Sequence, residues 1–168
     1  RDFRRRGSRA QLDAAALAAS RCAAMPPVDS HMEIALAEAS MAAEAGEVPV
    51  GAVVVDGASG EILARAHNRT ERDADPTAHA ELLAIRGAAR RLGDARLATC
   101  DLYVTLEPCP MCAAAIGFAR LRRLYYGAGD PKGGGVEHGP RIFSQPTCHH
   151  RSEEHTSELQ SRFGISYA

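Results

Sequence analysis

The chain has 168 residues, of which 45% are hydrophobic and 24% are charged, and its formal net charge is −1. These values are close to the averages of soluble globular proteins, and they argue against a disordered, a fibrous and a membrane protein. No apolar run approaches the roughly 20 residues of a membrane-spanning helix, so we expect no membrane partner. The length suits one domain. Because the net charge is small, any binding of nucleic acid depends on a local patch and not on bulk charge.

The two ends of the chain differ in composition from its middle. Residues 1–24 are rich in arginine and alanine, and we expect a non-native or upstream extension there, with a transit peptide as the alternative. Residues 151–168 begin with RSEEHTSELQS and resemble a translated sequencing adapter, so we expect a non-native tail, with a genuine polar tail as the alternative. The expected folded domain is therefore 25–150.

Between these ends the sequence predicts alternating helices and strands. The run SHME at 30–33 has the form of a capping box and predicts a first helix that ends near Gly46. The elements predicted after it are a hairpin of strands 50–55 and 61–66, a helix from Thr77 or Ala78 to Leu92, a strand at 102–106, a helix at 110–119 and a strand at 124–126. This order predicts a three-layer α/β fold, with helices on both faces of a mixed, mostly parallel sheet of about five strands.

The cysteines indicate a metal site. Their number is five, which is odd, and two of them lie in the run CPMC at 109–112. This pattern suits metal binding in a reducing compartment better than a disulfide framework. We therefore expect a cytoplasmic protein.

The candidate ligands are His79, Cys109 and Cys112, which lie at the starts of two predicted helices. Zinc binds nitrogen and sulfur donors tetrahedrally, and catalytic zinc sites combine three protein ligands with water. A helix amino terminus also favours the thiolate form of cysteine. We therefore predict one Zn²⁺ per chain. The alternative is a structural zinc site whose fourth ligand is one of Cys100, His138, Cys148 and His149.

Glu81 is the candidate catalytic residue. It follows His79 by two positions, and in the first turn of a helix its side chain can fold back beside a metal-bound water. One carboxylate that takes a proton from water and then passes it to a leaving amine suits a hydrolytic deamination.

The runs HAE at 79–81 and PCPMC at 108–112 resemble the signature of the zinc-dependent cytidine/deoxycytidylate deaminase superfamily. The segments 47–52, 68–69, 75–81 and 102–109 narrow this resemblance to the bacterial tRNA-specific adenosine deaminases. The similarity extends from about residue 32 to about residue 150. It implies a cytidine-deaminase-like fold, a homodimer, and conversion of adenosine to inosine at the wobble position of a tRNA anticodon loop, with the target base flipped out.

The resemblance also implies roles for single residues. Asn68 would hydrogen-bond the flipped nucleotide, Val50 would pack on its base, and Glu81 would carry the proton. Asp130, together with Lys132, would lie near the bound nucleic acid. Each substrate contact has a structural alternative, because Asn68 could end a strand, Val50 could belong to the core and Asp130 could form a turn.

Two features depart from the family pattern or extend it. Family members continue into a carboxy-terminal helix where this chain has the segment 151–168, and residues 133–140 lengthen the loop after Asp130. The arginines that follow the second ligand helix could contact phosphates or form a solvated face; they are Arg120, Arg122 and Arg123.

Two other functions remain open from the sequence. The first is a free-base deaminase for guanine or cytosine, which would use the same metal chemistry. The second is a non-catalytic zinc-binding module, against which Glu81 argues because a structural site has no use for that carboxylate. The segments 47–52 and 75–81 favour the tRNA deaminase.

Overall fold

The computed structural model describes residues 28–148 and 150–156. Its elements, in chain order, are α2 (Val28–Glu44), β1 (Gly51–Asp56), β2 (Ile62–His67), α3 (Ala80–Leu92), β3 (Cys100–Val104), α4 (Pro110–Ala119), β4 (Arg123–Tyr126), the 3₁₀ turn η1 (Ile142–Ser144) and β5 (Glu153–Thr156). The extension predicted at 1–24 lies outside the described residues. His149 also lies outside them, as does the part of the predicted tail at 157–168.

The strands form one five-stranded sheet in the order β2-β1-β3-β4-β5. Strand β1 is antiparallel to both β2 and β3, while β3 is parallel to β4 and β4 is parallel to β5. The predicted α/β fold with a mixed sheet of about five strands is confirmed. The predicted excess of parallel pairs is wrong, because two strand pairs are antiparallel and two are parallel. Strand β1 pairs antiparallel on both of its sides, with its hairpin partner β2 on one side and with β3 on the other.

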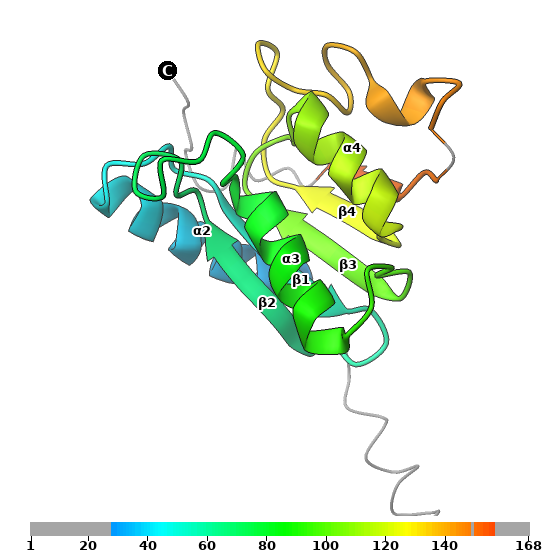
Figure 1. The fold of residues 1–168 in the computed structure, drawn as a ribbon, viewed down its shortest axis with the longest axis horizontal. Coiled ribbons are helices and arrows are strands. Elements are labelled where there is room, and N and C mark those ends of the chain that lie inside the picture. The colour runs from blue at the N-terminus through cyan, green and yellow to red at the C-terminus, as the bar shows by residue number, and fades with distance from the viewer. Residues whose placement is uncertain (1–27, 149, 157–168) are drawn as a thin grey trace, which may run out of the picture.

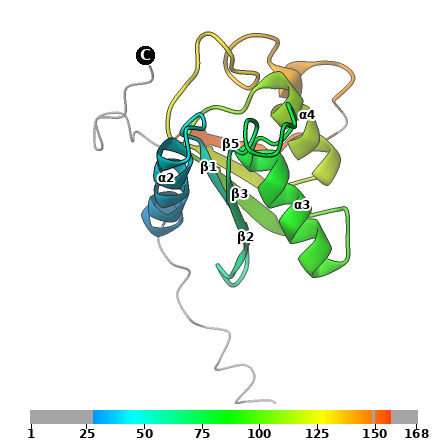
Figure 2. The same ribbon diagram turned by 60° about the vertical axis from the view of Figure 1, so that its left-hand side comes forward.

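Helices cover both faces of this sheet, as predicted (Figures 1 and 2). Along β1, Val53 and Val55 pack with Met32 of α2, whereas Ala52 and Val54 belong to the cluster formed with α3 and α4. Successive side chains of a strand point to opposite faces, so β1 contributes to both cores. Its central place explains why the run is almost wholly apolar and not alternating.

Two helices begin at other residues than the sequence predicts. Helix α2 begins at Val28, so Ser30 lies inside its first turn and not at the N-cap. Helix α3 begins at Ala80 and not at Thr77 or Ala78. The cause of the later start is a turn in which Asp75 Oδ1 accepts hydrogen bonds from both the backbone N–H and the hydroxyl of Thr77, at 2.8 and 2.7 Å.

Strand β5 lies in the segment for which the sequence predicts a non-native tail. Residues 153–156 pair in register with β4, and the Ser152 hydroxyl donates to the carbonyl of Leu121 at 2.6 Å. The sheet therefore extends past residue 150. The foreign origin of 151–168 stays a prediction, and in the part of the chain that the structure describes α4 is the last α-helix.

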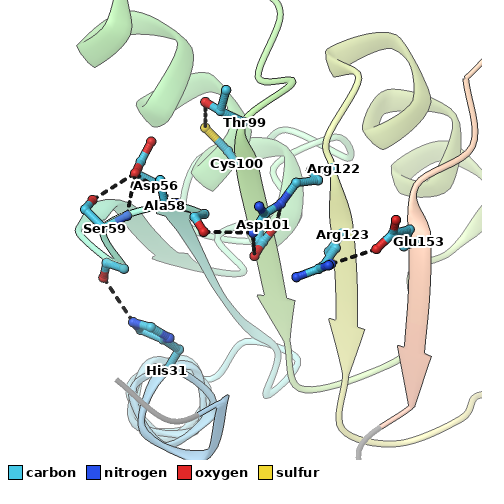
Figure 3. Close-up of polar contacts among 12 residues, drawn as sticks. His31, Asp56, Ala58, Ser59, Thr99, Cys100, Asp101, Arg122, Arg123 and Glu153 are labelled. Atoms are coloured by element: carbon cyan, nitrogen blue, oxygen red, sulfur yellow. Dashed lines mark hydrogen bonds and ion pairs between the residues drawn. The ribbon is translucent and has the colours of Figure 1, made fainter. Parts of the chain in front are cut away.

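The arginines after α4 take part in the fold. Arg122 donates to both carboxylate oxygens of the buried Asp101, at 2.8 and 2.7 Å, and Arg123 donates to Glu153 at 2.7 Å (Figure 3). Arg120 ends α4 in the left-handed conformation. Arg122 thus ties β3 to the strand that follows α4, in a structural role and not as a free phosphate ligand.

None of the helices within 28–148 and 150–156 combines the length and the apolar character that a bilayer crossing needs.

Candidate metal centre

The metal centre lies where the amino ends of α3 and α4 meet, and these two helices lie on the same face of the sheet (Figure 1). His79 is the N-cap of α3 and Cys109 is the N-cap of α4, both with extended backbone, and neither side chain caps its own helix. Proline suits the first helical position because its missing N–H would have no partner there, and Pro110 occupies that position in α4. The two N-cap side chains therefore point toward one another, at the positive ends of two helix dipoles.

The predicted ligands are brought together by the fold. His79 Nδ1 lies 3.7 Å from Cys109 Sγ and 3.6 Å from Cys112 Sγ, and all three donor atoms lie within 4.8 Å of one another. Zinc bonds of about 2.3 Å to sulfur and about 2.0 to 2.1 Å to nitrogen, at a tetrahedral angle, separate the donors by about 3.6 Å. The arrangement fits zinc, and Nδ1 is the imidazole nitrogen that faces the two sulfurs.

The two thiols interact strongly. The hydrogen bond from the Cys112 thiol, supported by backbone N–H groups of Met111 and Cys112, lowers the pKa of Cys109 to about 5. The same hydrogen bond and burial raise the pKa of Cys112 far above its usual range. One thiolate thus forms easily and the second does not. Ionisation of both requires a cation between them, which is a further reason why this donor set fits a metal ion.

A fourth protein ligand is absent from the described residues, where the ligand cluster contains only the three predicted donors. Cys148 donates its S–H to a backbone carbonyl at 3.0 Å, and His138 Nδ1 lies 2.6 Å from a carboxylate. Cys100 lies at the other end of the domain's central sheet, at the start of β3, and His149 is outside the described residues. Three ligands and an open position are typical of a catalytic zinc site.

Glu81 is buried in the first turn of α3, beside the metal ligands. Burial first, and then the negative charge of Cys109, raise the pKa of Glu81 to about 7, and its carboxylate hydrogen-bonds the Cys112 thiol. A carboxyl group with a pKa near neutrality can accept and release a proton at physiological pH. The catalytic role of Glu81 stays a prediction, for a carboxyl group that lies beside the metal ligands.

Asn68 and Val50 lie next to the start of α3. Asn68 Oδ1 accepts a hydrogen bond from the backbone N–H of Ala80 at 2.8 Å, and the carbonyl of Val50 accepts one from the backbone N–H of Asn68 at 3.1 Å. Both side chains are buried, and Val50 also belongs to the core cluster. Their substrate contacts therefore stay predictions, on residues that border the ligand His79.

Asp130 shapes its own turn. Its Oδ1 accepts hydrogen bonds from the backbone N–H groups of Lys132 and Gly133, both at 3.0 Å. This is the structural alternative for Asp130. A contact with nucleic acid stays a prediction.

Two buried glutamates near the site have roles that sequence reasoning did not assign. Glu47 accepts hydrogen bonds from Thr70 Oγ1 and from the backbone N–H groups of Glu71 and Arg72, at 2.8 to 3.2 Å. Glu107 accepts several from the loop after β4. Each is an acidic residue beside an apolar run that enters a strand or leaves one, which is the signal that could have indicated a buried carboxylate.

Comparison with known proteins agrees with this site. Residues 25–128 match the family described as the cytidine and deoxycytidylate deaminase zinc-binding region. The chain is 59% identical over 130 residues to a tRNA-specific adenosine deaminase from Agrobacterium fabrum, covering 77% of this chain and 84% of that one. It is 48% identical over 138 residues to one from Aquifex aeolicus, covering 79% and 90%.

Solved structures show the same fold. One, from studies of A-to-I editing by tRNA:A34 deaminases at the wobble position of transfer RNA, superposes with a TM-score of 0.76 at 58% identity, over 79% of this chain and 95% of that one. A guanine deaminase from Bacillus subtilis superposes with a TM-score of 0.61 at 31% identity, over 83% and 90%. The cytidine-deaminase-like fold is confirmed.

Proposed function

The chain belongs to the family of the cytidine and deoxycytidylate deaminase zinc-binding region. We propose that it deaminates adenosine hydrolytically to inosine at the wobble position of tRNA. The observation that carries the proposal is a three-ligand zinc site with a buried glutamate beside it, in a chain that is 59% identical to a tRNA-specific adenosine deaminase. The likeness to a guanine deaminase is weaker, at 31% identity, and favours the free-base reaction less.

Metal binding and proton transfer are assigned to different residues of this chain. His79, Cys109 and Cys112 would hold one zinc ion per chain. When bound, zinc makes water acidic enough to serve as a nucleophile near neutral pH. The Glu81 carboxylate would take a proton from the attacking water as the C–O bond to C6 of adenine forms. Glu81 then gives the proton to the departing amine, which leaves as ammonia.

Two residues would orient the base. Because Asn68 Oδ1 already accepts the N–H of Ala80, the group that Asn68 has for a substrate is its Nδ2 donor. We propose that Nδ2 donates to an acceptor on the flipped nucleotide and that Val50, on the neighbouring strand end, packs against the base. Asp130 is proposed to act near the RNA backbone through the turn that it caps.

The partner is proposed to be the anticodon loop of a tRNA, and the compartment the cytoplasm, where thiol ligands stay reduced. The test compares inosine formation in an anticodon stem-loop with ammonia release from free guanine, cytosine and adenine. We expect activity on the RNA and little on the free bases. Deamination of free guanine without activity on RNA would contradict the assignment. Zinc content near one ion per chain, measured after purification without chelator, checks the metal site.

We also propose that the protein is a homodimer that associates through the outer face of α4. Phe118 on this helix is 85% exposed. It borders a cavity of about 410 Å³, which is lined by Ala114 and Gly117 of α4, by Ile142 of η1 and by Cys148. The proposal rests on this exposed aromatic ring and on the apolar residues of the cavity beside it, which together form an apolar surface. Light scattering should find a dimer for the wild type and a monomer with unchanged zinc content for Phe118→Asp; a dimeric variant would place the contact elsewhere.

A further inference from the structure

Glu107 is a buried carboxylate that the proposed reaction does not use. It lies three residues beyond the end of β3 and precedes Pro108 and Cys109, and its side chain is fully buried. It accepts five hydrogen bonds, all from the 130–138 loop. Oε1 accepts from the backbone N–H groups of Val136, Glu137 and His138 at 3.0, 2.8 and 2.9 Å, and Oε2 pairs with the backbone N–H of Asp130 at 2.9 Å and with His138 Nδ1 at 2.6 Å.

These bonds join the two ends of the 130–138 loop through one side chain. Hydrogen bonds to an ionised acceptor are about twice as strong as those between neutral groups. A buried carboxylate also needs such donors to offset its desolvation. The loop thus depends on Glu107 for its shape, and Glu107 depends on the loop for its burial.

The loop in turn packs against the segment that presents the metal ligand. The backbone N–H of Gly135 donates to the carbonyl of Pro108 at 2.9 Å. A Cβ atom at Gly135 would lie 2.6 Å from the nitrogen of Pro110 and 2.9 Å from the carbonyl carbon of Cys109, so only glycine allows this approach. The loop backbone therefore lies directly on the turn that carries Cys109.

Cys109 is the N-cap of α4. Its carbonyl accepts the backbone N–H of Ala113 at 2.8 Å, and its sulfur faces the backbone N–H groups of Met111 and Cys112. The position of its sulfur is set by the backbone of residues 108–110, which is the backbone that the loop covers. A ligand held this way should lose its place when the support behind it is removed.

We propose that Glu107 is a positioning residue of the zinc site, which holds the 130–138 loop against residues 108–110 and so fixes Cys109 for metal binding. The inference rests on the zinc-dependent function proposed above. Glu107 touches neither substrate nor metal in this role. Its action passes through the loop backbone, and His138 contributes only one of the five bonds.

The experiment measures zinc release from the purified holoenzyme to a chromophoric chelator. The variants are Glu107→Ala, Glu107→Gln and His138→Ala. The matched control is Asp101→Asn, which changes another buried carboxylate, paired with Arg122 at the opposite end of β3. Unfolding in urea is measured for each variant, so that loss of zinc can be compared at known stability.

We expect Glu107→Ala to release zinc faster than wild type, on the order of 10- to 100-fold, which is the usual effect of removing a group that supports a metal ligand. Glu107→Gln keeps one acceptor oxygen but turns an NH₂ group toward the N–H of Asp130, so its release should be intermediate. His138→Ala should stay close to wild type because four backbone bonds remain. Asp101→Asn should lose stability but keep the wild-type rate of zinc release.

Wild-type release from Glu107→Gln and Glu107→Ala would overturn the proposal, as would equal acceleration by Asp101→Asn. If Glu107→Ala does not fold, the isosteric Glu107→Gln decides. Zinc release needs no substrate, so these results stand apart from the inosine assay. If Glu107 proves not to position Cys109, the proposed deaminase function is unaffected. A wild type that deaminates no substrate, but whose variants differ in zinc release as expected, would refute the proposed function alone.

Discussion

Substitution of Glu81 by glutamine should separate activity from stability. The amide cannot accept the proton of water, so turnover should fall by about 10²- to 10⁴-fold, the usual contribution of general acid-base catalysis. The fold and the zinc content should be retained, because Glu81 is not among the three donors. The same change should make the metal-free protein more stable at alkaline pH.

The size of that gain follows from the pKa of Glu81. Burial first raises it to about 7 in the folded protein, from 4.5 when exposed. Between these two pH values the unfolded chain has lost the proton and the folded chain has kept it. The free energy of unfolding therefore falls as pH rises, by about 1.4 kcal/mol per pH unit and about 3 kcal/mol in all. Above pH 7 Glu81 is ionised in both the folded and the unfolded protein, and the full loss in the free energy of unfolding remains.

The assay is urea unfolding of wild type and Glu81→Gln at pH 5 and pH 8, with chelator and reductant present. Cys109 also titrates in this range, and its charge contributes to the raised pKa of Glu81, so the difference between the two proteins reports burial and that charge together. We expect the variant to be more stable by less than about 1 kcal/mol at pH 5 and by about 3 kcal/mol at pH 8. A variant no more stable than wild type at pH 8 would refute the idea that burial destabilises the ionised form of Glu81. Substantial turnover by the variant would remove Glu81 from the proton-transfer role.

Three further changes test the fold. Gly51→Ala should cost about 1 to 3 kcal/mol in urea unfolding, because the new Cβ would lie 2.0 Å from the carbonyl oxygen of Ala35; an unchanged midpoint would contradict this. Arg122→Ala should cost about 3 kcal/mol, since it leaves the buried Asp101 unpaired, and a loss well below 1 kcal/mol would count against that ion pair. A chain ending at His150 loses β5 and should melt below the full chain. A chimera with a family carboxy-terminal helix should melt above both, since each buried large apolar side chain adds about 1.5 to 3 kcal/mol; equal melting of all three would make 151–168 irrelevant to stability.

The ligand set could be predicted from the sequence because its chemistry is local. Cys109 and Cys112 are separated by the spacing that brings two side chains to one end of a helix, and His79 and Glu81 start another helix. Residue type and spacing alone therefore predicted the metal, the number of ligands and the catalytic carboxylate. The two distances from His79 Nδ1 to the sulfurs required the fold, since they join two helices far apart in the chain.

The helices and the first four strands could also be predicted, because apolar periodicity and turn residues act over a few positions. The antiparallel pairing of β1 with β3 could not be predicted, since strand direction depends on how the intervening helix crosses the sheet. Strand β5 was missed for a related reason. Its residues Glu153–Thr156 have no apolar pattern of their own and become a strand through backbone pairing with β4.

The role of Glu107 shows most plainly what only the tertiary structure decided. In the sequence it is one acidic residue beside a proline. In the fold it meets five donors from a loop that begins more than twenty positions later, because β4 returns that loop to the end of β3. Side-chain chemistry and local spacing determined which residues can bind zinc and move a proton. Long-range packing decided which backbone supports them, since buried charges find their partners only after the strands have paired.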